Sequence, residues 1–171
     1  MNKPHSTQGW DKIVRSIHWI VATLFIINYY FTEAGYTAHI RVGWTIFGLV
    51  IFRILWGITK ARGPNHIRNF IPTINGIKEH LVELRNRESL HQVGHNACGS
   101  IVIFLMWFCL LTAAFTGWLQ DTDWGFENDV YEWHEFFVES LWYLIVMHIT
   151  AVIITSLWLR KNLIKQMILG K

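Results

Sequence analysis

Four long apolar runs separated by polar segments dominate the chain. They occupy about residues 13–32, 39–58, 95–119 and 134–160, and the purely apolar part of the fourth, about 140–159, follows a half-polar turn over 131–139. A helix needs about 20 mostly apolar residues to cross a membrane. We therefore expect an all-α protein in which residues 1–171 form one domain, a four-helix transmembrane bundle.

The segment between the second and third runs has a different pattern. Ile74, Ile77, Leu81 and Leu84 recur at helical spacing among charged residues. This pattern predicts an amphipathic helix lying on the membrane surface.

Composition supports a membrane protein and excludes several other classes. The chain is 52% hydrophobic and 16% charged, whereas soluble domains carry about 25% charged residues. Two cysteines are too few for a disulfide scaffold. No C-x-x-C-H motif occurs, which argues against covalently attached haem.

The basic residues predict the direction of the helices. Of the 15 lysines and arginines, 13 belong to one side: they lie at or before the start of the first run, between the second and third runs, or at or after the end of the fourth. Seven carboxylates lie instead between Asp121 and Glu139. Basic loops stay in the cytoplasm, so we expect up-down-up-down helices with both termini and the amphipathic helix cytoplasmic. The first run lacks a signal-peptide cleavage site, so we expect it to stay in the protein as a membrane anchor. The basic loops of this topology account for the net charge of +3, which is therefore poor evidence for nucleic-acid binding.

Nine histidines divide into two groups by position. Four fall in the expected connections and are interpreted as solvated surface residues: His5, His66, His80 and His91. Five lie in or at the ends of the apolar runs: His18, His39, His95, His134 and His148. A polar ring at membrane depth is costly without a partner, so the second group holds the candidate functional residues.

The depths of four histidines predict two pairs. His134 and His148 share the fourth run, 14 residues apart, so both rings project from nearly the same helix face, about 21 Å apart along the axis. His18 enters the first run from the cytoplasmic side, level with His148. His39 opens the second run from the outer side, level with His134.

Two imidazoles at each level fit the two axial positions of a haem iron. Zinc usually takes three or four ligands in one cluster, which matches two per level poorly. Two haems across the bilayer would form an electron path from one surface to the other. A haem-free metal-ion transporter remains as an alternative use of the same pairs.

Other residues are candidates for supporting roles. His95 begins the third run and could replace His18 as a ligand, bind a haem propionate, contribute to a quinone site or cap its helix. Gly43 follows His39 by one helical turn and could admit a flat macrocycle, or could simply be a helix-packing glycine. The guanidinium groups of Arg15, Arg41 and Arg53 could bind haem propionates. Arg41 and Arg53 lie near the two ends of the second run, and long side chains that reach the membrane interface explain their positions equally well.

Several motifs together resemble one family. They are Trp10-Asp11-x-x-x-Arg15-x-x-His18-Trp19, His39-x-x-x-Gly43, Phe52-Arg53-x-x-Trp56-Gly57, Gly94-His95-Asn96, Trp133-His134-Glu135, and His148 leading into Leu159-Arg160-Lys161-Asn162-Leu163. In this order, over essentially the whole chain, they resemble the bacterial cytochrome b561 family, which includes the b-type cytochrome subunits of nickel–iron hydrogenases. Ala97 stands where related chains usually have proline.

The resemblance implies a membrane cytochrome with two b haems. The family's axial ligands correspond to His18, His39, His134 and His148. Similar proteins pass electrons between quinone and a periplasmic c-type cytochrome or an oxidoreductase subunit. We expect Asp11, Arg15 and His95 to line a cytoplasmic exit for quinol protons. The alternative is an enzyme resembling superoxide oxidase, which passes electrons from a small molecule to quinone.

Overall fold

The protein was analysed as a computed structural model that describes residues 11–61, 65–76, 78, 82, 97–160 and 162–170. The regular elements of these residues are all helical: α1 (Lys12–Tyr30), α2 (Thr37–Thr59), η2 (Ile67–Phe70), α4 (Ala97–Leu119), α5 (Asp123–Glu127), α6 (Val130–Leu159) and α7 (Leu163–Leu169). Among them, four helices are long and apolar enough to cross a membrane: Lys12–Tyr30, Thr37–Thr59, Gly99–Leu119 and Val130–Trp158. The predicted all-α fold with four long apolar helices is confirmed.

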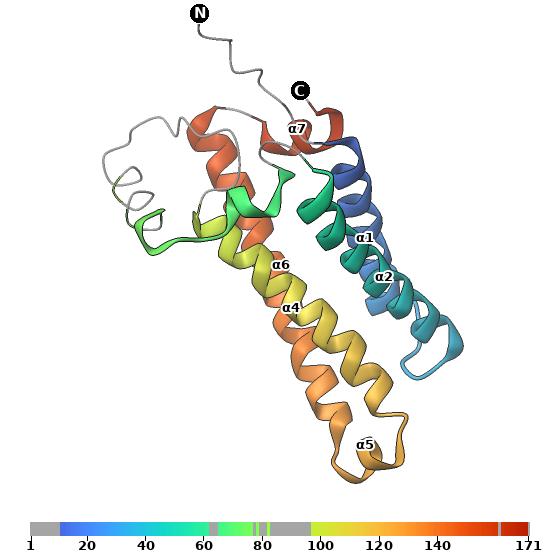
Figure 1. Ribbon diagram of the computed structural model, residues 1–171. Helices are drawn as coiled ribbons and strands as arrows, with labels where there is room; N and C mark the ends of the chain where they lie inside the picture. Colours follow the sequence, from blue (N-terminus) through green and yellow to red (C-terminus); the bar gives the residue numbers. More distant parts are fainter. Residues whose placement is uncertain are drawn as a thin grey trace, which may run out of the picture.

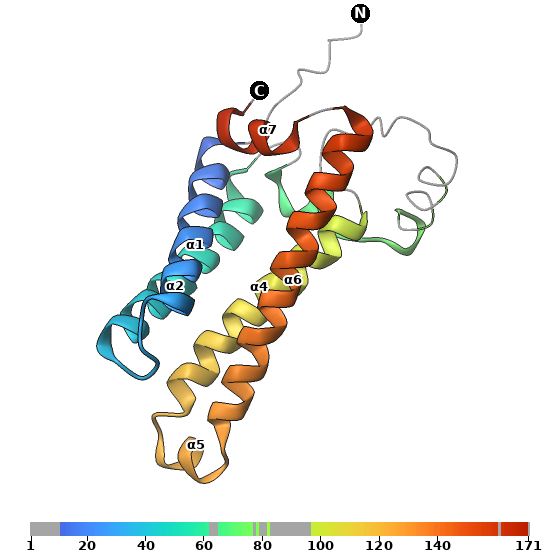
Figure 2. The same cartoon turned by 180° about the vertical axis from the view of Figure 1, so that it is seen from behind.

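The long helices pack as two pairs, α1 with α2 and α4 with α6, and α2 contacts α4 between the pairs (Figures 1 and 2). The connection between α1 and α2 lies at the same end of the bundle as α5, which we name the α5 end. The start of α1, the end of α6 and the short helix α7 lie at the opposite end, which we name the α7 end.

Helix α6 differs from the sequence expectation at its start. It begins at Val130, so the half-polar segment 131–139 is helical and the predicted turn is wrong. Within this segment Phe137 packs against the core while Glu135 and Glu139 line an outward-facing hollow. Helical spacing thus gathers the glutamates on one face and turns Phe137 to another, a pattern that a window of average hydropathy does not detect.

The predicted amphipathic helix lies largely outside the described residues, which include Ile74 but neither Ile77, Leu81 nor Leu84. Residues 74–76, 78 and 82 are helical. A continuous surface helix therefore stays a prediction.

Polar contacts join α1 to α2 at the α7 end. The Asp11 carboxylate caps α1 by accepting from the Ile13 N–H at 3.0 Å, and its second oxygen accepts from Trp56 Nε1 at 3.0 Å. The Asp11 N–H donates to the side chain of Asn65, whose carbonyl accepts from the buried Arg53. One Asp11 oxygen thus caps α1, and the other holds the start of α1 against the end of α2.

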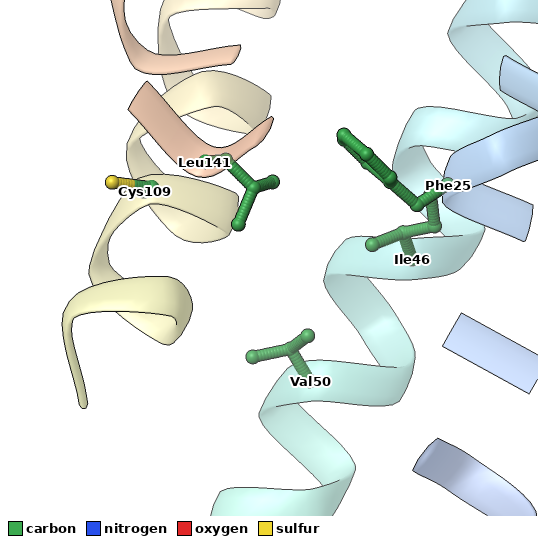
Figure 3. Packing of buried hydrophobic residues seen from close by; sticks show 5 residues of the cluster. All are labelled: Phe25, Ile46, Val50, Cys109 and Leu141. Carbon is green, nitrogen blue, oxygen red and sulfur yellow. The ribbon is translucent and has the colours of Figure 1, made fainter. Parts of the chain in front are cut away.

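Apolar side chains join the two helix pairs near the middle of the bundle. The buried cluster takes Phe25 from α1, Ile46 and Val50 from α2, Cys109 from α4 and Leu141 from α6. Figure 3 shows that Phe25 and Leu141 point toward one another across the space between the pairs. This layer separates the α5 end from the α7 end and keeps the two helix pairs in register.

Candidate functional site

One pair of histidines lies toward the α7 end. The ring centres of His18, on α1, and His148, on α6, are 6.4 Å apart, and the ring planes cross at 58°. Each helix pair therefore contributes one imidazole at this level.

A second pair with nearly the same spacing lies toward the α5 end. The ring centres of His39, on α2, and His134, on α6, are 6.2 Å apart, with planes crossing at 69°. Within the described part of the chain, no three His, Cys, Asp or Glu side chains gather closely enough to share a metal ion. The structure thus brings imidazoles together two at a time.

Both rings of the α5-end pair have polar partners at Nδ1. His134 Nδ1 lies 2.8 Å from the carbonyl oxygen of Ala113 on α4 and 3.5 Å from the Thr116 hydroxyl. A carbonyl can only accept, so Nδ1 of His134 carries the proton and the lone pair belongs to Nε2. His39 Nδ1 lies 3.2 Å from the hydroxyl of Thr32, in the connection between α1 and α2.

A glycine on α4 makes room for the His134 ring. A Cβ added at Gly117 would lie 3.1 Å from Cε1 and 3.2 Å from Nδ1 of His134. A side chain at this position would crowd the ring by a few tenths of an ångström, so glycine lets the ring lie close to α4, where it reaches the Ala113 carbonyl. Gly117 therefore positions His134.

Gly43 and Arg15, two further residues singled out from the sequence, have different surroundings. A Cβ at Gly43 would meet only Asn28 Nδ2, at 4.0 Å, so a close approach of another helix does not require this glycine. Arg15 reaches α7, where Nη1 donates to the Ile168 carbonyl at 2.6 Å. Its Nε is buried without a partner among the described residues, and His95 lies outside them.

Aromatic rings occupy the level between the two histidine pairs. Trp142 on α6 stacks on Tyr29 with ring centres 5.5 Å apart, and on Phe25 at 6.2 Å. Trp142 lies between His134 and His148 on the same helix. The two histidine pairs are therefore separated by packed side chains.

Comparison with known families identifies the chain. A family model described as prokaryotic cytochrome b561 matches residues 9–170. The chain belongs to the prokaryotic cytochrome b561 family. Neither the curated proteins nor the solved structures that were compared contain a match.

Membership in the cytochrome b561 family confirms the resemblance drawn from the motifs. It makes the protein a haem-binding membrane cytochrome of prokaryotes that takes part in electron transport. The four long apolar helices agree with this location.

Sequence reasoning missed Thr32, Ala113 and Gly117, which contact the histidines of the α5-end pair. Gly117 could have been found, because it lies near the outer end of the third apolar run, at the expected depth of His134. Ala113 acts through its backbone carbonyl, for which its side chain gives no signal. Thr32 precedes the second run, and nothing in its spacing from His39 indicates a contact.

Proposed function

We propose that this cytochrome b561 family member binds two b haems and carries electrons across the membrane between quinone and an extracytoplasmic redox partner. His18 and His148 would hold one haem iron, and His39 and His134 the other. Bound haem supplies the reversible one-electron chemistry, and the chain supplies ligands, spacing and a low-dielectric surrounding.

The spacing of the rings is the observation that carries the proposal. A metal–imidazole bond is about 2.0 Å long and a ring nitrogen lies about 1.1 Å from its ring centre, so two rings that hold one iron between them would have centres about 6.2 Å apart. The observed separations are 6.4 Å and 6.2 Å. Two independent pairs at this spacing, each joining one helix pair to the other, fit bis-histidine haem sites.

Space beside the ligands also fits a flat cofactor. Among the described residues outside the backbone of its own helix turn, only Asn28 Nδ2, at 4.0 Å, comes within contact distance of a Cβ added at Gly43, one turn after His39. We assign Gly43 to the porphyrin contact of the α5-end haem. We assign Arg15 and His95 to the surroundings of the α7-end haem, where the buried Nε of Arg15 offers a donor to a propionate.

The charge distribution supports an orientation. The α7 end and the segment between α2 and α4 carry most of the lysines and arginines, whereas α5 and the first turns of α6 are acidic. Basic segments remain in the cytoplasm. We therefore place both termini in the cytoplasm, with the helices crossing up-down-up-down, and the α5 end facing outward from a bacterial inner membrane.

The outward α5 end offers a surface for a protein partner. Glu132, Glu135 and Glu139, with Phe136, Ser140 and Tyr143, line a hollow of about 360 Å³. Carboxylates in this position attract a positively charged protein and speed its encounter. We therefore propose a basic periplasmic c-type cytochrome or oxidoreductase subunit as partner, with quinone as the membrane-soluble reactant.

Haem counts in histidine variants test the proposal. The purified full chain is expected to contain two haems b by the pyridine haemochrome assay. Single changes to alanine at His18, His39, His134 and His148 should each remove one haem. The double variant His39→Ala/His134→Ala should retain one haem, whereas His39→Ala/His148→Ala should retain none.

His66→Ala is the matched control, because His66 lies outside both pairs and caps η2 by accepting from the Arg68 N–H at 3.2 Å. It should keep both haems. A colourless wild-type chain, or double variants that lose haem without regard to pairing, would refute the assignment. Reduction of quinone by superoxide without a protein partner would instead indicate a superoxide-oxidase-like enzyme.

A further inference from the structure

The hydroxyl of Thr32 contacts three polar groups at once. It lies 2.7 Å from the carbonyl oxygen of Asn28, 2.9 Å from Asn28 Oδ1 and 3.2 Å from His39 Nδ1. Thr32 lies just beyond the C-cap of α1, and Asn28 lies in the last turn of that helix. The connection between α1 and α2 thus folds a hydroxyl back onto the imidazole at the start of α2.

The shortest of these contacts decides where the hydroxyl proton lies. A threonine hydroxyl has one proton to donate and two lone pairs that accept. The Asn28 carbonyl can only accept, and two oxygens 2.7 Å apart repel each other unless a proton lies between them. The proton therefore points to Asn28, and the hydroxyl oxygen is left to accept from His39.

This acceptor favours one tautomer of the neutral His39 ring. If the hydroxyl accepts at Nδ1, then Nδ1 carries the hydrogen and the lone pair of the neutral ring lies on Nε2. The argument holds if the Asn28 side-chain amide is turned over, because its nitrogen would then donate to the hydroxyl and the carbonyl contact would remain.

We propose that Thr32 is a positioning residue for the α5-end haem: it accepts a hydrogen bond from His39 Nδ1 and so directs Nε2 toward the iron. The inference rests on the proposed function, because His39 is an axial ligand only there. Such partners hold the ligand ring in place and make it a stronger electron donor, which stabilises ferric iron and lowers the reduction potential. His134 receives the corresponding support from a backbone carbonyl, which a substitution cannot remove, whereas the Thr32 hydroxyl can be removed by one substitution.

Replacement of Thr32 by valine tests this role, because valine keeps the branched shape and removes the hydroxyl. In purified Thr32→Val protein we expect about 10-fold weaker retention of one haem, since loss of such partners typically costs about 10–100-fold in metal affinity. We also expect that haem to show a higher midpoint potential and a shifted low-spin ferric electron paramagnetic resonance signal. The second haem should be unchanged in all three measurements.

Two variants serve as controls. Thr32→Ser keeps the hydroxyl and should restore the wild-type potential and spectrum. Thr45→Val removes a hydroxyl that is exposed on α2 and donates to the Arg41 carbonyl at 2.8 Å rather than contacting a histidine, and should behave as wild type. If valine prevents assembly, Thr32→Ala carries the same prediction without the added methyl group.

The outcomes separate this inference from the proposed function. Two haems in the wild type and an unchanged α5-end haem in both Thr32→Val and Thr32→Ala would overturn the role of Thr32 and leave the haem sites intact. Equal losses of both haems in these variants would also overturn it, since the hydroxyl would then matter only for folding. A wild-type chain without haem would refute the proposed function itself.

Discussion

Replacing Gly117 by alanine should weaken the α5-end haem site while leaving the helix bundle folded. The added Cβ would lie 3.1 Å from Cε1 of His134. Carbon atoms in comfortable contact are about 3.5–4.0 Å apart, so the ring must move by about 0.4 Å or more. If that movement is away from α4, the 2.8 Å hydrogen bond to Ala113 lengthens to about 3.2 Å, the long limit of an N–H···O bond.

The expected magnitude is about a 10-fold loss of affinity for one haem, or about 1.4 kcal/mol. The free energy of unfolding should fall by less than overpacking alone would cause. Overpacking costs about 1–3 kcal/mol, whereas alanine gains about 1 kcal/mol over glycine inside a helix. The haem site and the fold should therefore respond differently to Gly117→Ala.

Gly48→Ala is the matched control, because a Cβ at Gly48 on α2 meets nothing within 4 Å. It carries the same gain in helix propensity without touching a histidine. The assay is transfer of haem from the purified cytochrome to apomyoglobin, followed for each haem by its absorbance. If Gly117→Ala releases its haems no faster than Gly48→Ala, the contact with His134 does not position a ligand and the reasoning fails.

Three further changes test other parts of the structure. Asp11→Ala removes the cap of α1 and the hydrogen bond from Trp56. Denaturant titrations should show the free energy of unfolding lowered by about 1–2 kcal/mol while both haems remain. Loss of a haem would instead place Asp11 at the cofactor. Gly170→Ala should weaken the packing of α7 on the bundle, because φ is +75° at this position and the new Cβ would lie 2.8 Å from the Arg15 guanidinium carbon. A protease should then cleave the C-terminal segment faster, and an unchanged cleavage rate would contradict the prediction. Gly43→Ala should impair retention of the α5-end haem although the protein itself leaves room for the methyl group, and normal retention would remove Gly43 from the haem contact.

The sequence was sufficient to predict the long helices and which histidines meet. Length and hydropathy identify membrane helices because a bilayer requires every backbone polar group to be bonded within the helix. Once helices are placed, depth alone puts His18 near His148 and His39 near His134, and the structure places both pairs of rings within 6.4 Å. Their role as haem ligands stays a prediction.

The details around each ring could not be read from the sequence in the same way. The start of α6 was predicted too late because acidic residues on one helix face lowered the average hydropathy of a continuous helix. The partners of His39 and His134 depend on how a connection folds back and on a main-chain carbonyl of another helix. Such contacts follow from tertiary packing and not from the spacing of residues along the chain.

The arrangement of the proposed ligands would tie haem binding to assembly of the bundle. Both His134 and His148 belong to α6, whereas His18 and His39 belong to α1 and α2. Each proposed haem therefore joins the same two helix pairs, at two levels separated by the layer of Phe25 and Leu141. A ligand that binds only the assembled form stabilises that form by its binding free energy. In the proposed arrangement, two such links would hold α1 and α2 against α4 and α6 at both ends of the bundle, so the bonds that place the redox centres would also fix the distance that electrons must cross.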